Sequence, residues 1–153
     1  MKHFYNILML LVLVPLTVVA NHDKFKGKHT KEKTVSKEFN VNANAGLRVA
    51  NSYGSISIST WNQNKTVIDV VIKANGNNEE KVVEKLRQIE IDFQSNAAKV
   101  SAVTNFGASK SKWKSWFGSG DNSVSVEVNY TIKLPITNTV DISNDYGTIS
   151  IDK

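Results

Sequence analysis

The sequence contains no cysteine. This absence excludes disulfides, thiol catalysis, iron–sulfur clusters, cysteine-ligated zinc and a lipid-modified N-terminal cysteine. Histidine is nearly as scarce, since His3, His22 and His29 all precede the region in which strand patterns begin. A Ser-His-Asp or Cys-His site within the folded part is therefore excluded, and zinc or copper sites lack ligands. The H-E-x-x-H, Walker and G-x-G-x-x-G motifs are also missing, so metalloprotease and nucleotide-binding functions have no support.

Long hydrophobic runs are missing from all but the first twenty residues. There, Lys2 precedes an apolar run from Ile7 to Val14, and Val18-Val19-Ala20 places small residues where a signal peptidase cleaves. Because eight apolar residues are too few to span a hydrocarbon core of about 30 Å, residues 1–20 are predicted to be a signal peptide rather than a membrane anchor. We expect cleavage near Ala20 and export to the periplasm, the outer cell surface or the medium, with no transmembrane anchor.

Residues 21–38 have few apolar side chains. The segment holds six lysines against three acidic residues, and it is predicted to be a charged flexible spacer. A basic arm of this kind could bind anionic lipid, polysaccharide or nucleic acid, but its interspersed acids favour a solvated linker. His22 and His29 are not expected to bind a metal, because nothing nearby would hold them in place.

The remaining residues, 39–153, are predicted to form one domain. The whole chain of 153 residues is 41% hydrophobic with a net charge of +5, which is typical of a globular protein. After Phe39, apolar and polar residues alternate with the period of half-buried strands. A single helix is expected from Asn78 to about Gln88, with Asn77 as its cap and Glu80 completing a capping box. The expected strands are 46–50, 55–60, 67–73, 89–93, 99–104, 124–134, 139–143 and 148–152.

An internal repeat is the most informative feature. LRVANSYGSISIS, from Leu47 to Ser59, aligns without gaps on VDISNDYGTISID, from Val140 to Asp152. Each copy predicts a strand, a corner and a second strand, in which asparagine bonds its own backbone or adopts a left-handed conformation and glycine permits a positive φ. The structural corners are Asn51, Tyr53, Gly54, Asn144, Tyr146 and Gly147.

Two all-β architectures fit this repeat. Strand–corner–strand units favour a β-solenoid (β-helix-like) with one short helix, in which each rung covers the last. The alternative is an antiparallel β-sandwich with two similar corners, because solenoid repeats are normally much closer together than these two copies.

The order of these segments resembles a known family. In chain order, the segments are N-x-Y-G-x-I-x-I, Trp61, TVIDVVIKA, a short helix, IEIDF, an aromatic loop, VNYTIKLP and a second N-x-Y-G-x-I-x-I. This order is similar to that of the putative adhesin family of domain of unknown function 4097 (DUF4097). The resemblance implies an exported β-rich protein of the kind common in Bacteroidetes. That family continues with further G-x-I-x-I rungs, whereas this sequence stops at Lys153. This departure leads us to expect a fragment, an early stop, or a protein completed by self-association through its last strand.

A loop between two expected strands is the best candidate for a contact surface. Residues 105–122 combine aromatic rings, which stack on sugars or bases, with lysines, which attract anionic groups. The alternatives are insertion of the tryptophans into a membrane interface and packing of the rings over an open solenoid end. The candidate residues are Phe106, Lys110, Lys112, Trp113, Lys114, Trp116 and Phe117.

Two pairs of residues with side-chain oxygens are weaker candidates. Glu90 and Asp92 point to one face of a strand and could flank a glycosidic bond, but an outward polar face explains them better. Asp121 and Asn122 could add oxygens to a calcium site, but they lack the regular aspartate spacing of calcium loops, and a plain turn is favoured.

The sequence therefore predicts a non-enzymatic protein without catalytic, metal or cofactor residues. We expect an adhesin-like envelope or cell-surface interaction module that contacts glycan or another envelope component through the aromatic–lysine loop, and no nucleic acid. The alternative is a structural or assembly subunit that self-associates through its C-terminal strand edge, as a homo-oligomer.

Overall fold

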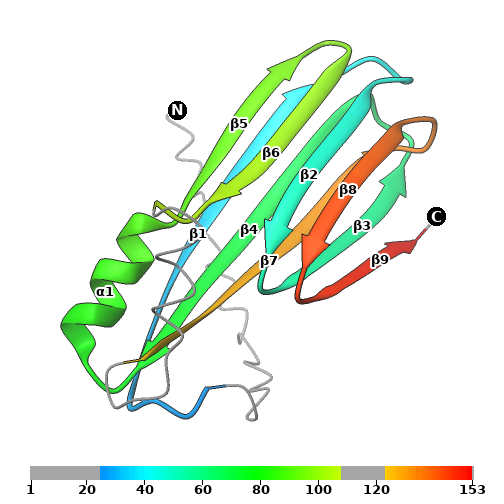
Figure 1. Cartoon of the computed structure of the whole chain (residues 1–153). Helices are drawn as coiled ribbons and strands as arrows, with labels where there is room; N and C mark the ends of the chain where they lie inside the picture. The colour runs from blue at the N-terminus through cyan, green and yellow to red at the C-terminus, as the bar shows by residue number, and fades with distance from the viewer. Residues whose placement is uncertain (1–24, 108–122, 153) are drawn as a thin grey trace, which may run out of the picture.

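The computed structural model describes residues 25–107 and 123–152. This part of the chain contains nine strands and one helix (Figure 1). The elements are β1 (His29–Asn40), β2 (Gly46–Ser52), β3 (Ser55–Trp61), β4 (Lys65–Gly76), α1 (Glu79–Gln88), β5 (Glu90–Asn96), β6 (Lys99–Asn105), β7 (Val124–Pro135), β8 (Thr139–Asp145) and β9 (Thr148–Asp152). The prediction of an all-β fold with one short helix is confirmed.

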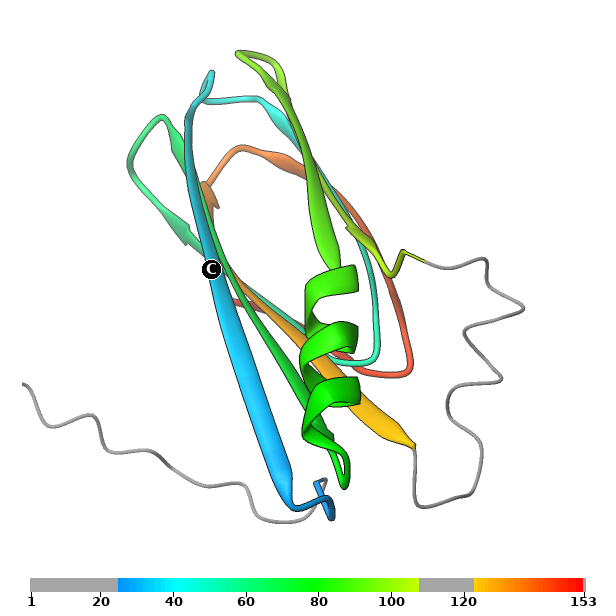
Figure 2. The same ribbon diagram turned by 90° about the vertical axis from the view of Figure 1, so that its left-hand side faces the viewer.

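The strands form two layers, which Figure 2 shows from the side. One sheet has five strands in the order β1-β4-β7-β3-β9, and the other has four in the order β5-β6-β2-β8. Both sheets are mixed. The pairs β1–β4, β4–β7 and β5–β6 are antiparallel, whereas β2 and β3 pair only with parallel neighbours. The fold therefore consists of two facing, mixed β-sheets.

Alternation along the strands places the core between these layers. In β4 the residues Ile68, Val70 and Ile72 are fully buried, and their neighbours are half-buried. Leu47 and Val49 of β2 supply the opposite wall from the four-stranded sheet. This is the period-two pattern that the sequence predicts for strands with one buried face.

Helix α1 covers the part of the five-stranded sheet that the smaller sheet leaves open. Strands β1, β4 and β7 have 12 residues each, whereas those of the four-stranded sheet have seven. The helix packs on the extra length of the long strands, chiefly on β4 and β1 (Figure 2). Val82 and Lys85 are buried there, and desolvation lowers the pKa of Lys85 to about 8.

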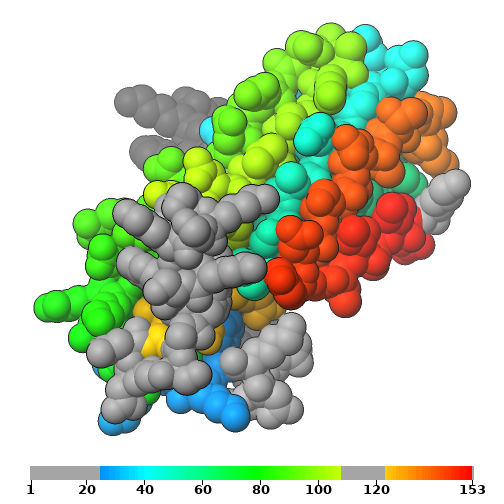
Figure 3. Space-filling model, viewed as in Figure 1, coloured from blue at the N-terminus to red at the C-terminus, as the bar shows by residue number. Residues whose placement is uncertain are grey.

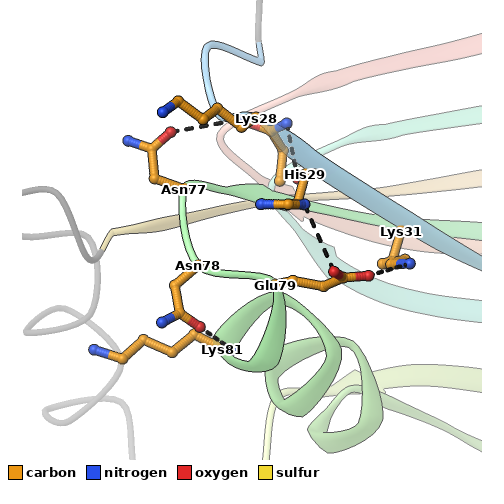
Figure 4. Close-up of polar contacts among 8 residues, drawn as sticks. Lys28, His29, Lys31, Asn77, Asn78, Glu79 and Lys81 are labelled. Atoms are coloured by element: carbon orange, nitrogen blue, oxygen red, sulfur yellow. Dashed lines mark hydrogen bonds and ion pairs between the residues drawn. The ribbon is translucent and has the colours of Figure 1, made fainter.

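The cap of the helix differs from the prediction by one residue. Asn78 is the N-cap, and its Oδ1 accepts a hydrogen bond from the Lys81 backbone N–H at 3.0 Å (Figure 4). The predicted cap, Asn77, instead accepts from the Lys28 backbone N–H at 3.3 Å. Lys81 therefore takes the third helical position, and the predicted capping box with Glu80 does not form.

The prediction of a flexible spacer over residues 21–38 is wrong for 29–38. These residues belong to β1, which pairs with β4 along its whole length. Its charges balance those of its neighbours, because Glu38 lies 2.6 Å from the Lys65 ammonium and Lys31 lies 2.6 Å from Glu79 (Figure 4). Charged side chains are typical of an edge strand, where they oppose edge-to-edge aggregation. The high charge therefore marked an edge strand rather than a linker.

Candidate functional site

The two copies of the repeat lie directly against each other. β8 pairs with β2 in parallel register, so that Leu47 faces Val140 and Asn51 faces Asn144. β9 pairs with β3 in the same way, with Ile56 facing Ile149. Each copy therefore forms one rung, β2–β3 or β8–β9, that contributes a strand to both sheets (Figure 1). The offset of 93 residues in sequence becomes nearest-neighbour stacking in space.

The left-handed residue of each corner is tyrosine. The φ angles of Tyr53 and Tyr146 are 63° and 61°, whereas neither Gly54 nor Gly147 has a positive φ. The prediction that these glycines supply the positive φ is therefore wrong. Residues with a Cβ rarely adopt this left-handed backbone conformation. In both corners the tyrosine ring is stacked on its counterpart, with 5.3 Å between the ring centroids and 6° between the planes.

The corner glycines are needed because the backbones approach closely. A Cβ on Gly54 would lie 1.9 Å from the Val128 carbonyl oxygen of β7. A Cβ on Gly147 would lie 1.6 Å from the Gly54 carbonyl oxygen. The absence of a Cβ at Gly54 thus allows the first rung to pack closely on β7, and its absence at Gly147 allows the second rung to pack closely on the first. A larger residue at either position would prevent this contact.

The corner asparagines connect successive layers. The Asn51 Nδ2 donates to the Val128 carbonyl at 2.9 Å and to the Asn144 Oδ1 at 3.2 Å. The Asn144 Nδ2 repeats the first bond one layer further, to the Gly54 carbonyl at 2.9 Å. Asn144 also reaches its own backbone at Thr148, as predicted, whereas the bonds of Asn51 run to other strands.

A buried polar chain extends this network into the core. The Thr104 hydroxyl donates to the Asn51 Oδ1 at 2.9 Å and lies 2.7 Å from the Tyr130 hydroxyl. Because the threonine hydrogen is used toward Asn51, the Tyr130 hydroxyl donates to Thr104. Burial raises the pKa of Tyr130 to about 12, although its side-chain hydrogen bond with Thr104 acts in the opposite direction. These hydrogen bonds link β7, β6, β2 and β8.

The second rung is exposed where the first is buried. Leu47, Ile56 and Ile58 are at most 2% exposed, whereas their register partners Val140, Ile149 and Ile151 are 41%, 45% and 51% exposed. The rungs have similar sequences, so the difference arises because nothing in the described part of the chain covers the outer side of β8 and β9. Figure 3 shows these strands in orange and red at one side of the molecular surface.

Both strands of this rung are also sheet edges. β8 ends the four-stranded sheet and β9 ends the five-stranded sheet. The Tyr146 ring, with one face on Tyr53, is 75% exposed. The outer side of β8 and β9, together with the exposed Tyr146 ring, forms one surface, which we call the open rung. It combines two neighbouring sheet edges with partly exposed apolar side chains. Exposed edges and apolar patches of this kind are common sites of protein association.

Most of the predicted contact loop lies outside the described residues. Phe106 is half-buried against the core, and its ring meets Tyr53 edge-on with 5.9 Å between centroids. This position joins Phe106 to the corner tyrosines. The residues outside the described part are Lys110, Lys112, Trp113, Lys114, Trp116 and Phe117.

The other candidate residues that lie within the described part of the chain are not brought together into a site. Glu90 and Asp92 lie on the exposed face of β5, opposite the half-buried Ile91 and Phe93. The His29 Nδ1 lies 3.8 Å from the Glu79 carboxylate. Across residues 25–107 and 123–152, no three histidine, aspartate or glutamate side chains gather as a metal site. The predicted signal peptide, His22, Asp121 and Asn122 lie outside the described residues.

Membrane-spanning helices are absent from residues 25–107 and 123–152. α1 is too short and too polar to cross a bilayer, and no other helix occurs in the described segments.

Comparison with known proteins gives one distant structural neighbour. The crystal structure of a putative adhesin from Bacteroides fragilis matches 76% of this chain with a TM-score of 0.38 and 13% sequence identity. The match spans 42% of that protein, so this chain corresponds to less than half of its length. No family model and no curated protein matches the sequence. The resemblance to the DUF4097 family therefore stays a prediction.

Proposed function

We propose that this protein is an exported, non-enzymatic interaction module of the bacterial envelope or surface, adhesin-like in the manner of the DUF4097 family, and that the open rung is its contact surface. The observation that carries the proposal is the contrast between Ile58, which is 1% exposed, and its register partner Ile151, which is 51% exposed. Covering the inner side chains of β8 and β9 would remove apolar surface from water, which favours association. Export is supported by the signal-peptide pattern of residues 1–20.

The aromatic–lysine loop is a second contact element in this proposal. Phe106, at its start, packs on Tyr53, whose ring stacks on the exposed Tyr146. In this proposal Trp113 and Trp116 of the loop would contact a glycan or other envelope component.

Binding to envelope preparations of the producing bacterium tests the proposal. We expect Ile151→Lys to weaken retention of the purified full chain on these preparations at least about tenfold, because the contact would have to desolvate the charged lysine ammonium. Ser150→Lys is the matched control, since it adds the same charge to β9 at the adjacent position, whose side chain points to the other face of the sheet. Equal retention of the wild-type chain and the Ile151→Lys variant would exclude the open rung as the contact surface.

A structural subunit that self-associates through β9 is the second candidate. The exposed edge of β9 favours it, because an unpaired strand can pair with another copy. In that case the full chain would form concentration-dependent oligomers that Ile151→Lys dissociates.

A further inference from the structure

We propose that the open rung binds a strand–corner–strand segment of a partner polypeptide, in parallel register, that carries the pattern N-x-Y-G-x-I-x-I. This inference rests on the proposed function and specifies the chemistry of the partner. The template for it is the β2–β3 rung, which already contacts the inner side of β8–β9 in that register.

The hydrogen-bond ladder can be continued by one layer. Asn51 donates to the Val128 carbonyl, and Asn144 donates to the Gly54 carbonyl in the equivalent place. The Gly147 carbonyl occupies in the second corner the position that Gly54 has in the first. An asparagine at the corner of the partner would therefore donate to Gly147, while both edges of the rung accept its strands by β-augmentation.

The exposed aromatic and apolar side chains of the open rung require in the partner the residue types that the repeat already has. The exposed face of Tyr146 offers a partner ring the stacking that Tyr146 itself makes on Tyr53. Isoleucines two apart in the second strand of the partner would cover Ile149 and Ile151, as those residues cover Ile56 and Ile58. A glycine after the tyrosine is required, since a Cβ at this position approaches the carbonyl of the previous layer to within 1.6 Å in the existing stack.

Charge adds a further condition on the partner. Between Thr139 and Asp152 the open rung contains Asp141, Asp145 and Asp152 and no basic residue. On the inner side, the Arg48 Nη1 lies 3.6 Å from the Asp141 carboxylate. A basic residue at the position of Arg48 in the partner would form the corresponding pair from the outer side.

A second copy of this chain meets these conditions poorly. Its β2–β3 rung, which has the right sequence, is already enclosed between β6 and β7 on one side and β8–β9 on the other. It would have to present its own β8–β9 rung, which adds three more aspartates to the interface and no basic residue to pair with them. Repulsion between these like charges disfavours a second copy, so a different polypeptide is favoured.

A peptide with the sequence of residues 47–59, LRVANSYGSISIS, is the probe for this proposal. We expect the labelled peptide to bind the full-length chain in a fluorescence-anisotropy titration. A peptide with the Gly54→Ala substitution should bind at least about tenfold more weakly, because its corner cannot approach Gly147. A peptide with Arg48→Glu should also bind more weakly, and added salt should reduce the difference between it and the parent peptide.

Variants of the full chain locate the binding. Ile151→Lys should weaken binding of the parent peptide at least about tenfold, whereas Ser150→Lys should leave it within about twofold. Circular dichroism of both variants verifies that they are folded, which is expected because Ile151 is half exposed.

Three results would overturn the proposal. They are no binding at about 1 mM peptide, equal binding of the parent and Gly54→Ala peptides, and unchanged binding by the Ile151→Lys variant. A concentration-dependent dimer of the full chain that Ile151→Lys dissociates would assign the open rung to a second copy instead. Retention on envelope preparations does not involve the peptide, so the proposed function can hold even if the parent peptide fails to bind.

Discussion

Replacing Gly54 with alanine is expected to lower the free energy of unfolding by about 3 kcal/mol or more. The new Cβ would lie 1.9 Å from the Val128 carbonyl oxygen and 2.6 Å from its carbonyl carbon. Both are backbone atoms, so no side-chain rotation relieves the overlap. The corner would have to move away from β7, which would also break the bond from Asn51 to Val128. Chemical denaturation monitored by circular dichroism measures this loss.

Gly46→Ala is the matched control for this substitution. The nearest atom to its new Cβ would be the Thr139 Oγ1 at 3.5 Å, an ordinary contact, and Gly46 has no positive φ. We expect a change of less than about 1 kcal/mol at this position. If Gly54→Ala were as stable as Gly46→Ala, the close packing of the first corner on β7 would be contradicted.

The stability of the protein is expected to fall between about pH 10 and pH 12 because of Tyr130. Its pKa is raised to about 12 in the folded state, mainly by burial. The folded state thus holds the proton more tightly than the unfolded chain, whose tyrosine titrates near pH 10. The contribution is complete below about pH 10 and is lost as the pH rises through the folded pKa, amounting to roughly 2–3 kcal/mol.

Comparison with Tyr130→Phe isolates this effect. The variant should be about 1 kcal/mol less stable at neutral pH, since Thr104 loses its donor. It should lose less stability than the wild type as the pH is raised, because every other titratable group is common to the two proteins. Parallel pH profiles of the two proteins would show that Tyr130 ionises as easily in the folded state as in the unfolded chain.

The strands with one buried face could be predicted from the sequence. Alternation in 67–73 and 124–134 identified β4 and β7, and the boundaries of β9 agree with the prediction. β1 could not be found in this way, because Val35 and Phe39 are its only apolar residues and the rest of the strand is polar. It is held by backbone pairing with β4, which leaves no hydrophobic period in the sequence.

The repeat predicted the corners but not their conformation. Asparagine and glycine both have a known tendency for left-handed backbone, so the positive φ was assigned to them. In the structure the tyrosine takes this conformation, and the glycine is required by the contact with the previous layer. A contact between residues about 75 or 93 apart in sequence cannot be read from local propensity.

The open rung was foreseen only in part. The sequence predicted an edge at the last strand, from Ile149 to Asp152, and the structure places β9 at the end of its sheet. That β8 is also an edge, and that Tyr146 adds an exposed ring between the two, depends on the stacking of the repeats.

Hydrogen–deuterium exchange of the full chain tests most directly whether the open rung is an available binding surface. We expect residues 139–152 to exchange faster than the equivalent residues 46–59, because they are covered on one side only. We also expect the peptide LRVANSYGSISIS to slow exchange in 139–152 more than in any other segment. Equal protection of the two rungs in the free chain, or peptide-induced protection elsewhere, would show that the open rung is not the binding surface.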